Sequence, residues 1–97
     1  MNCQLENIFS LKGKVIVVTG ATGLLGKKHV EAIACYGGTP ILLDLSQQKI
    51  NDFVNDLNDK YQVDAVGFAI DITNEKMIKD NAKYLISRFG KIDGLVN

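Results

Sequence analysis

Three glycines and two aspartates are the residues whose types and spacing point to chemistry. Gly20, Gly23 and Gly26 follow the apolar run VIVVT, while Asp44 and Asp71 each end a later apolar run. Glycines let a strand turn directly into a helix, and the free N–H groups at the start of that helix attract an anion. We therefore predict a phosphate-binding turn at the three glycines. A plain tight turn is the alternative.

The elements that must position these residues alternate along the chain. Four segments have the continuously apolar, β-branched character of strands buried on both faces: residues 14–20, 39–45, 64–71 and 94–97. Three segments with helical periodicity separate them, and the glycines at 37–38 and Gly90 end the first and the third. The order β-α-β-α-β-α-β predicts an α/β fold with parallel strands, right-handed crossovers and helices on both faces of the sheet.

Caps and apolar stripes define the helices further. Ser46 is the expected N-cap of the second helix and Thr73 that of the third. The residues expected to face the sheet are Val30, Ile33 and Ala34 in the first helix, Ile50, Phe53, Val54, Leu57 and Tyr61 in the second, and Ile78, Ala82, Leu85, Ile86 and Phe89 in the third.

The two aspartates fit the chemistry of a nucleotide. Asp44 follows Gly20 by 24 residues, close to the spacing at which an acid accepts hydrogen bonds from the adenosine ribose. Such a carboxylate repels a 2′-phosphate, and no Arg or Lys follows before Lys49, so the sequence favours NAD over NADP. Asp71 is expected at the same sheet edge, near the adenine amino group. The alternatives are an ordinary acid at a helix N-terminus for Asp44 and a capping role for Asp71.

Composition excludes several classes of protein. The 97 residues carry 11 basic and 11 acidic side chains, which argues against nucleic acid or an anionic membrane as the main partner. The N-terminus lacks the apolar core of a secretory signal, so we expect a cytoplasmic protein, with a loose arm at residues 1–10 and one domain at 11–97. Cys3 and Cys35 form no metal-binding spacing, and His29 has no acid or cysteine partner nearby in the sequence.

Four motifs in order carry a family resemblance: LKGKVIVVTGATGLLG, ILLDL, AIDIT and FGKIDGLVN. Together they resemble the N-terminal half of a short-chain dehydrogenase/reductase, from about residue 11 to residue 97. The resemblance implies a partial Rossmann fold with strand order 3-2-1-4. It also implies that the glycine loop holds the pyrophosphate, with Leu25 acting through its backbone N–H, and that Asn97 begins an Asn-Asn-Ala-Gly motif beside the cofactor. The expected cofactor contacts are Gly20, Gly23, Leu25, Gly26, Asp44, Asp71, Ile72 and Asn97.

The glycine spacing departs from the standard members of that family. Standard members have TGxxxGxG, whereas this chain has TGxxGxxG with Leu24 in place of the middle glycine. The spacing is similar to that of extended members, many of which act on nucleotide sugars, while FGKIDGLVN resembles the standard members. A sugar-type substrate is therefore one hypothesis.

Catalysis in the family uses a Ser and a Tyr-x-x-x-Lys pair, and no Tyr-x-x-x-Lys occurs in this sequence. We accordingly expect the NAD(P)-binding portion of an oxidoreductase, truncated before its catalytic half, with no catalytic residue of its own and the fourth strand left as an open edge. A homo-oligomer is an expected assembly. The alternatives are a non-catalytic dinucleotide-binding or interaction module and a methyltransferase-like domain. The latter is disfavoured because Thr19-Gly20 stands where an acid-x-Gly-x-Gly pattern is usual.

Overall fold

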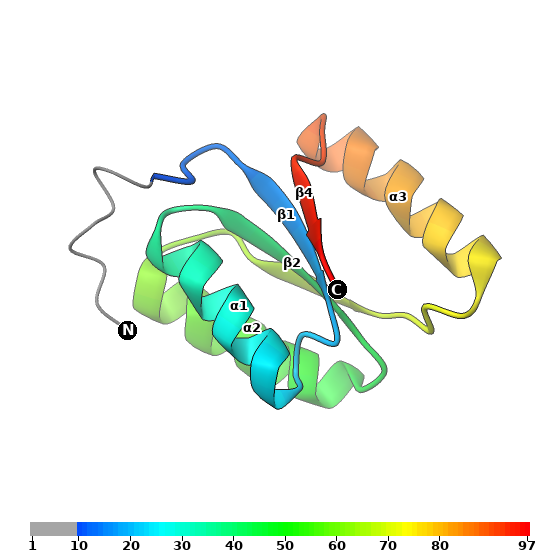
Figure 1. Cartoon of the computed structure of the whole chain (residues 1–97), viewed down its shortest axis with the longest axis horizontal. Coiled ribbons are helices and arrows are strands. Elements are labelled where there is room, and N and C mark those ends of the chain that lie inside the picture. Colours follow the sequence, from blue (N-terminus) through cyan, green and yellow to red (C-terminus); the bar gives the residue numbers. More distant parts are fainter. Residues whose placement is uncertain (1–9) are drawn as a thin grey trace.

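The structure, a computed structural model, describes residues 10–97 as four strands alternating with three helices (Figure 1). The strands are β1 (Val15–Thr19), β2 (Thr39–Asp44), β3 (Val66–Ala69) and β4 (Gly94–Val96). The helices are α1 (Leu24–Cys35), α2 (Gln47–Tyr61) and α3 (Glu75–Phe89). This order confirms the predicted alternation. The expected arm lies outside the described residues except for Ser10, which is exposed.

The strands form one parallel sheet in the order β3-β2-β1-β4, which confirms the predicted Rossmann-type topology. β1 is central to the pairing: Val17 is in register with Ile41 of β2 on one side and with Leu95 of β4 on the other. Because all strands run the same way, their carboxyl ends meet at one edge of the sheet. The loops that carry the predicted site residues leave from that edge.

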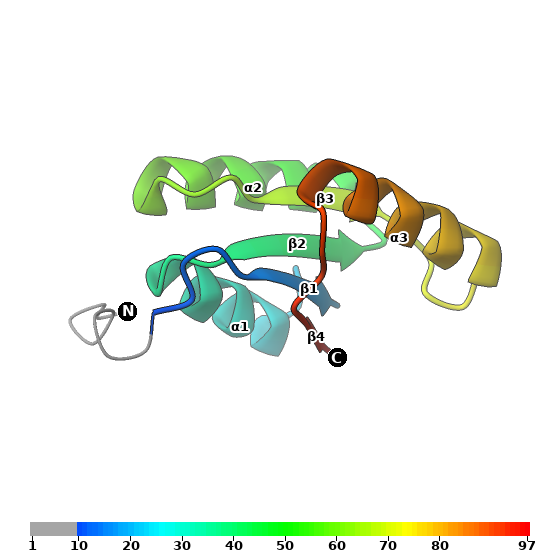
Figure 2. The same ribbon diagram turned by 90° about the horizontal axis from the view of Figure 1, so that it is seen from above.

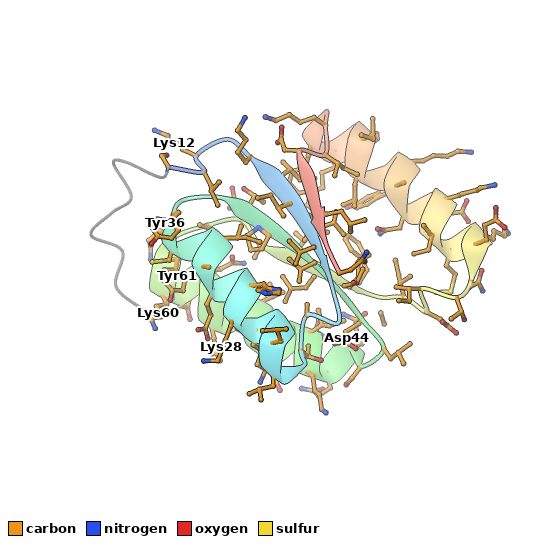
Figure 3. All side chains as sticks on the ribbon, viewed as in Figure 1. Lys12, Lys28, Tyr36, Asp44, Lys60 and Tyr61 are labelled. Carbon is orange, nitrogen blue, oxygen red and sulfur yellow. The ribbon has the colours of Figure 1, made fainter. Side chains whose placement is uncertain are left out.

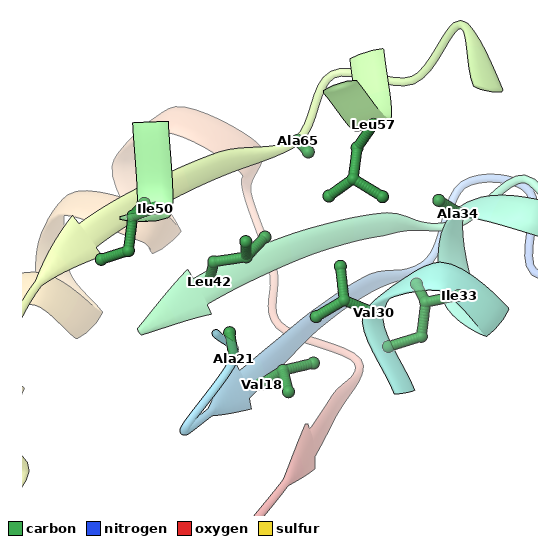
Figure 4. Close-up of a cluster of buried hydrophobic side chains, with 9 residues drawn as sticks. All are labelled: Val18, Ala21, Val30, Ile33, Ala34, Leu42, Ile50, Leu57 and Ala65. Carbon is green, nitrogen blue, oxygen red and sulfur yellow. The ribbon is translucent and has the colours of Figure 1, made fainter. Parts of the chain in front are cut away.

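Helices cover both faces of the sheet, α1 and α2 on one side and α3 on the other (Figures 1 and 2). Side chains of β2 alternate between the two layers. Leu42 packs with Val30 of α1 in the cluster drawn in Figure 4, whereas Ile41 and Leu43 belong to a second cluster that includes Leu85 of α3. The fully apolar strands are thus explained by burial on both faces.

The helix ends follow the sequence expectations with one correction. Ser46 caps α2, since its Oγ accepts a hydrogen bond from the Lys49 N–H at 3.3 Å. The expected cap at Thr73 is wrong: Asn74 caps α3, and its Oδ1 accepts from the Met77 N–H at 3.1 Å. The Thr73 hydroxyl is engaged elsewhere, because it donates to Asp71.

The predicted apolar stripes are buried or half-buried with one exception. Val30, Ile33, Ala34, Ile50 and Leu57 are all buried. In α3, Leu85 is buried but Ile86 is 48% exposed, so its expected place in the core is wrong. One residue along a helix turns the side chain by about 100°, and this turn carries Ile86 away from the sheet that Leu85 contacts.

β4 is held to β1 by the segment just before it. The Val15 N–H donates to the Asp93 carboxylate at 2.8 Å, and the Asp93 N–H donates to the Val15 carbonyl at 2.7 Å. Lys91 lies 3.1 Å from the same carboxylate. The far side of β4 pairs with no strand of the described chain, and Leu95 is 62% exposed. The expected open edge is therefore present.

Within residues 10–97 the structure has no cluster of three or more His, Cys, Asp or Glu side chains suited to a metal ion. The same part of the chain contains no helix with the length and apolar character needed to cross a membrane. His29 lies half-buried in the middle of α1.

Candidate functional site

The carboxyl edge of the sheet carries a cavity of about 260 Å³. Its walls come from the ends of β1, β2 and β3 and from the loops that follow them. The lining residues are Gly20, Leu43, Asp44, Leu45, Ile70, Asp71, Ile72 and Thr73. Four of the eight predicted contacts, Gly20, Asp44, Asp71 and Ile72, therefore meet around one cavity. Figure 3 shows Asp44 at the end of the sheet opposite Tyr36 and Tyr61.

The glycine loop makes a close turn from β1 into α1. Gly20 has φ +62°, a left-handed conformation that favours glycine. Gly26 lies so close to the loop that a Cβ there would stand 2.8 Å from the Gly20 carbonyl carbon and 3.0 Å from the Ala21 Cα. The expectation that Gly26 permits close packing is thus confirmed. The Gly23 N–H closes the turn by donating to the Gly20 carbonyl at 3.0 Å.

The start of α1 presents backbone N–H donors that have no acceptor among residues 10–97. Gly23 is the N-cap and supplies no side-chain cap, and the first turn contains no acidic residue. Since the first helical bond runs from Lys27 to the Gly23 carbonyl, the N–H groups of Leu24, Leu25 and Gly26 have no carbonyl within the helix to bond. These donors and the positive end of the helix dipole make the turn suited to a phosphate.

Asp44 is fixed at the end of β2 by three hydrogen bonds. The Thr22 N–H and hydroxyl both donate to Oδ2, at 2.9 and 2.6 Å, and the Leu45 N–H donates to Oδ1 at 2.7 Å. Partial burial raises the pKa of this carboxyl, but the bonds from Thr22 and Leu45, together with the charge of Lys49, outweigh it and leave the pKa below its ordinary value. Asp44 is therefore ionised at neutral pH. Oδ1, with a single donor, retains capacity to accept another.

Asp71 lies across the cavity and shapes the turn before α3. Its Oδ1 accepts the Thr73 hydroxyl at 2.6 Å and the Thr73 N–H at 2.9 Å, and its carbonyl accepts the Asn74 N–H at 2.9 Å. The hydrogen bonds from the Thr73 hydroxyl and N–H hold the pKa of the Asp71 carboxyl below its ordinary value. Both side-chain bonds go to Oδ1, so Oδ2 accepts no hydrogen bond from residues 10–97. Oδ2 therefore keeps its capacity to accept a hydrogen bond.

Asn97 lies outside this cavity, beside the end of β1. The Thr19 hydroxyl is 3.2 Å from Asn97 Oδ1 and 3.4 Å from the Val96 carbonyl, so it links β1 to the end of β4. Asn97 lines instead a second, largely apolar cavity of about 370 Å³ between α3 and the β1–β4 face of the sheet. Ile72 lines both cavities. Gly23, the N-cap of α1, and Leu25, in its first turn, are both exposed.

Three threonines were not predicted as residues of this site: Thr19, Thr22 and Thr73, the last of which was expected only to cap a helix. Each stands beside a predicted residue or motif, but a lone threonine has no distinctive spacing. Thr73 is the one with a local signal, which comes from Asp71, since an aspartate often accepts the backbone N–H two residues later in an Asx turn. The partner of Thr22 lies 22 residues away in the sequence and depends on the fold.

Comparison with known protein families identifies the family of this chain. Residues 14–97 match the family model described as short chain dehydrogenase. The chain belongs to the short-chain dehydrogenase family. This confirms the resemblance drawn from its four motifs.

Similar proteins and structures show how the length of this chain compares with that of other short-chain dehydrogenases. The 7alpha-hydroxysteroid dehydrogenase of Escherichia coli K12 is 33% identical over 89 residues, which cover 90% of this chain and 34% of that protein. The L-sorbose reductase of Gluconobacter frateurii, solved with NADPH and L-sorbose, superposes with a TM-score of 0.85 at 26% identity, over 91% of this chain and 34% of the reductase. An NAD⁺-bound xylitol dehydrogenase superposes with a TM-score of 0.76 at 29% identity, over 88% of this chain and 32% of the dehydrogenase. The chain thus spans about a third of the length of the curated relatives it matches.

Proposed function

We propose that this chain is the NAD-binding portion of a short-chain dehydrogenase that transfers a hydride between NAD and a carbonyl or secondary alcohol. The observation that carries the proposal is the position of Asp44. Its ionised carboxylate lines the cavity and is hydrogen-bonded to Thr22, which belongs to the loop that leads into the N-terminus of α1. An acid and a helix N-terminus in this relation match the two hydrogen-bonding ends of a nucleoside diphosphate.

The residues present fit such a dinucleotide. The N–H groups of Leu24, Leu25 and Gly26 would donate to the pyrophosphate, and Asp44 Oδ1 would accept from a ribose hydroxyl. The apolar walls of the 260 Å³ cavity, formed by Leu43, Ile70, Leu45 and Ile72, are suited to a flat base. The remaining oxygen of Asp71 would accept a hydrogen bond from an exocyclic amino group, such as the one that adenine carries.

The preference for NAD over NADP rests on charge. The neighbouring folds bind both cofactors, NADPH in the L-sorbose reductase and NAD⁺ in the xylitol dehydrogenase. A 2′-phosphate would bring a second negative group against the Asp44 carboxylate, whose pKa is already lowered and which therefore stays charged at neutral pH. NAD carries a hydroxyl at that position, which donates to the carboxylate instead.

The nicotinamide ring supplies the hydride chemistry once the cofactor is bound. The part of this chain is to bind and orient the cofactor. The Ser and Tyr-x-x-x-Lys groups that move the substrate proton in the family would come from residues other than these 97. A sugar-type substrate is the narrower proposal, supported by the TGxxGxxG spacing and by the likeness to structures of L-sorbose reductase and xylitol dehydrogenase.

The test is binding of NAD⁺ and NADP⁺ to the 97-residue chain, measured by calorimetry and by amide shifts in NMR spectra. We expect NAD⁺ to shift the amides of the glycine loop and to bind roughly tenfold more tightly than NADP⁺, because of the carboxylate at the ribose. Asp44→Asn should abolish that preference. Asp64→Asn, which removes the same charge at the opposite edge of the sheet, should preserve it. Amide shifts elsewhere than the loop, or equal affinities in the unmodified chain, would count against the proposal.

A non-catalytic binding module is the second candidate, favoured by the open edge of β4 and the apolar cavity beside it. The two candidates differ in turnover. Protein isolated from its natural source should oxidise NADH in the presence of a suitable carbonyl compound if the first is right. It should bind NAD without turnover, alongside a second polypeptide on β4, if the second is right.

A further inference from the structure

Thr22 makes two contacts with one carboxylate oxygen, although the two residues belong to different loops. Its N–H lies 2.9 Å and its hydroxyl oxygen 2.6 Å from Asp44 Oδ2. Thr22 is in the turn between β1 and α1, whereas Asp44 ends β2. Both side chains are half-buried. The short O–H···O⁻ distance is typical of a charge-assisted hydrogen bond.

These contacts fix which oxygen of Asp44 faces a ligand. Oδ2 is filled by the two Thr22 donors, and Oδ1 accepts the Leu45 N–H at 2.7 Å. A carboxylate held at both oxygens cannot rotate about its last torsion without breaking at least one bond. Its spare acceptor capacity is therefore confined to Oδ1, and its charge stays in the wall of the cavity.

We propose that Thr22 is a positioning residue that sets the choice between NAD and NADP by locking the Asp44 carboxylate in place. The proposal rests on the proposed function, since it concerns the same nucleotide site. A carboxylate held in one orientation accepts a hydrogen bond from a ribose hydroxyl, and its negative charge repels a 2′-phosphate at the same position. Without the Thr22 hydroxyl, the carboxylate keeps its two N–H donors but loses the shortest of its three hydrogen bonds, so its orientation is held less firmly.

Three variants separate the positioning role of Thr22 from a general effect on the fold. Thr22→Val removes the hydroxyl and keeps the shape of the side chain, whereas Thr22→Ser keeps the hydroxyl. Thr39→Val, the control, makes the same change at the start of β2, at the far edge of the sheet. We expect Thr22→Val to weaken NAD⁺ binding about tenfold and to bring the ratio of the NAD⁺ affinity to the NADP⁺ affinity closer to one. Thr22→Ser should restore both, and Thr39→Val should change neither.

A second readout needs no cofactor. The carboxyl pKa of Asp44, followed by carbon NMR titration, should rise in Thr22→Val and return to its original value in Thr22→Ser. Thermal unfolding of each variant identifies any loss of fold. Failure of the unmodified chain to bind either nucleotide overturns the proposed function and the selectivity role together. Normal binding with an affinity ratio unchanged in Thr22→Val overturns the role of Thr22 alone.

Discussion

Replacing Gly26 with alanine tests how tightly α1 is pressed against the glycine loop. The new Cβ would stand 2.8 Å from the Gly20 carbonyl carbon and 3.0 Å from the Ala21 Cα, and nearer still to the Gly20 carbonyl oxygen. Ordinary contacts begin at 3.4 Å, so the helix must retreat by at least about 0.6 Å. All three atoms are backbone, so no change of rotamer can relieve the overlap.

The size of the effect follows from two opposed terms. Alanine favours a helix interior over glycine by about 1 kcal/mol. Overpacking against a rigid neighbour costs about 3 kcal/mol at the upper end of its usual range. The net loss in free energy of unfolding is therefore about 2 kcal/mol. For a chain of this size, that loss lowers the urea midpoint by roughly 2 M.

Urea unfolding followed by circular dichroism at 222 nm measures this loss, since the chain has no tryptophan. Gly23→Ala is the matched control, because its Cβ would meet only the Gly20 carbonyl oxygen, at 3.3 Å. The control should lose less than about 1 kcal/mol. If Gly26→Ala were as stable as the unmodified chain, the contact between α1 and the loop would not constrain the fold and the reasoning would be refuted.

Three further predictions concern residues outside the glycine loop. The Tyr61 hydroxyl is buried and has no hydrogen-bond partner among residues 10–97, so Tyr61→Phe should raise the free energy of unfolding by up to about 1 kcal/mol in urea titrations. A decrease would show that the hydroxyl has a partner. The hydrogen bond from the Val15 N–H, with lesser help from nearby lysines, lowers the pKa of Asp93. Its stabilising effect should therefore be complete above the unfolded-state pKa of about 3.9 and be lost as the pH falls through the lower folded value. Asp93→Ala should accordingly weaken this acid dependence in urea midpoints measured between pH 7 and pH 2, and an unchanged dependence would contradict the assignment. A Cβ at Gly67 would overlap the Ile50 γ-methyl, so Gly67→Ala should lower the free energy of unfolding by about 1–3 kcal/mol. In a chain that already carries Ile50→Ala, the same substitution should cost less, because the methyl group that it meets is gone. An equal cost in both backgrounds would argue against the contact.

The sequence predicted those features that depend on local pattern. Strands such as 39–45 and the helix after Ser46 are recognisable from apolar runs and periodicity, and the parallel order follows from the length of the crossovers. The expected cap of α3 is wrong by one residue because Thr73 and Asn74 both have capping side chains, and only the bond from Thr73 to Asp71 decides between them. The expectation for Ile86 is wrong because the helical pattern defines an apolar stripe but not its edges.

Contacts between distant segments could not be predicted. The bonds from Thr22 to Asp44 and from Val15 to Asp93 join residues that are 22 and 78 positions apart. Each depends on which strands become neighbours and on their register. Nothing in the local sequence of Thr22 or Val15 distinguishes them from other loop and strand residues. The sequence therefore predicted which residues belong to the candidate site. The hydrogen bonds that orient their carboxylates and lower their pKa values are known only from the fold.

The position of β1 between β2 and β4 has a consequence for biosynthesis. β2 is made soon after β1, but β4 follows only after two more helices and another strand. While the ribosome adds the intervening residues, the side of β1 that will pair with β4 has unpaired backbone groups. Contacts of such wide sequence separation form slowly. The emerging chain therefore carries an open strand edge until β4 at Gly94–Val96 has been made, and this is the interval in which a chaperone would protect it.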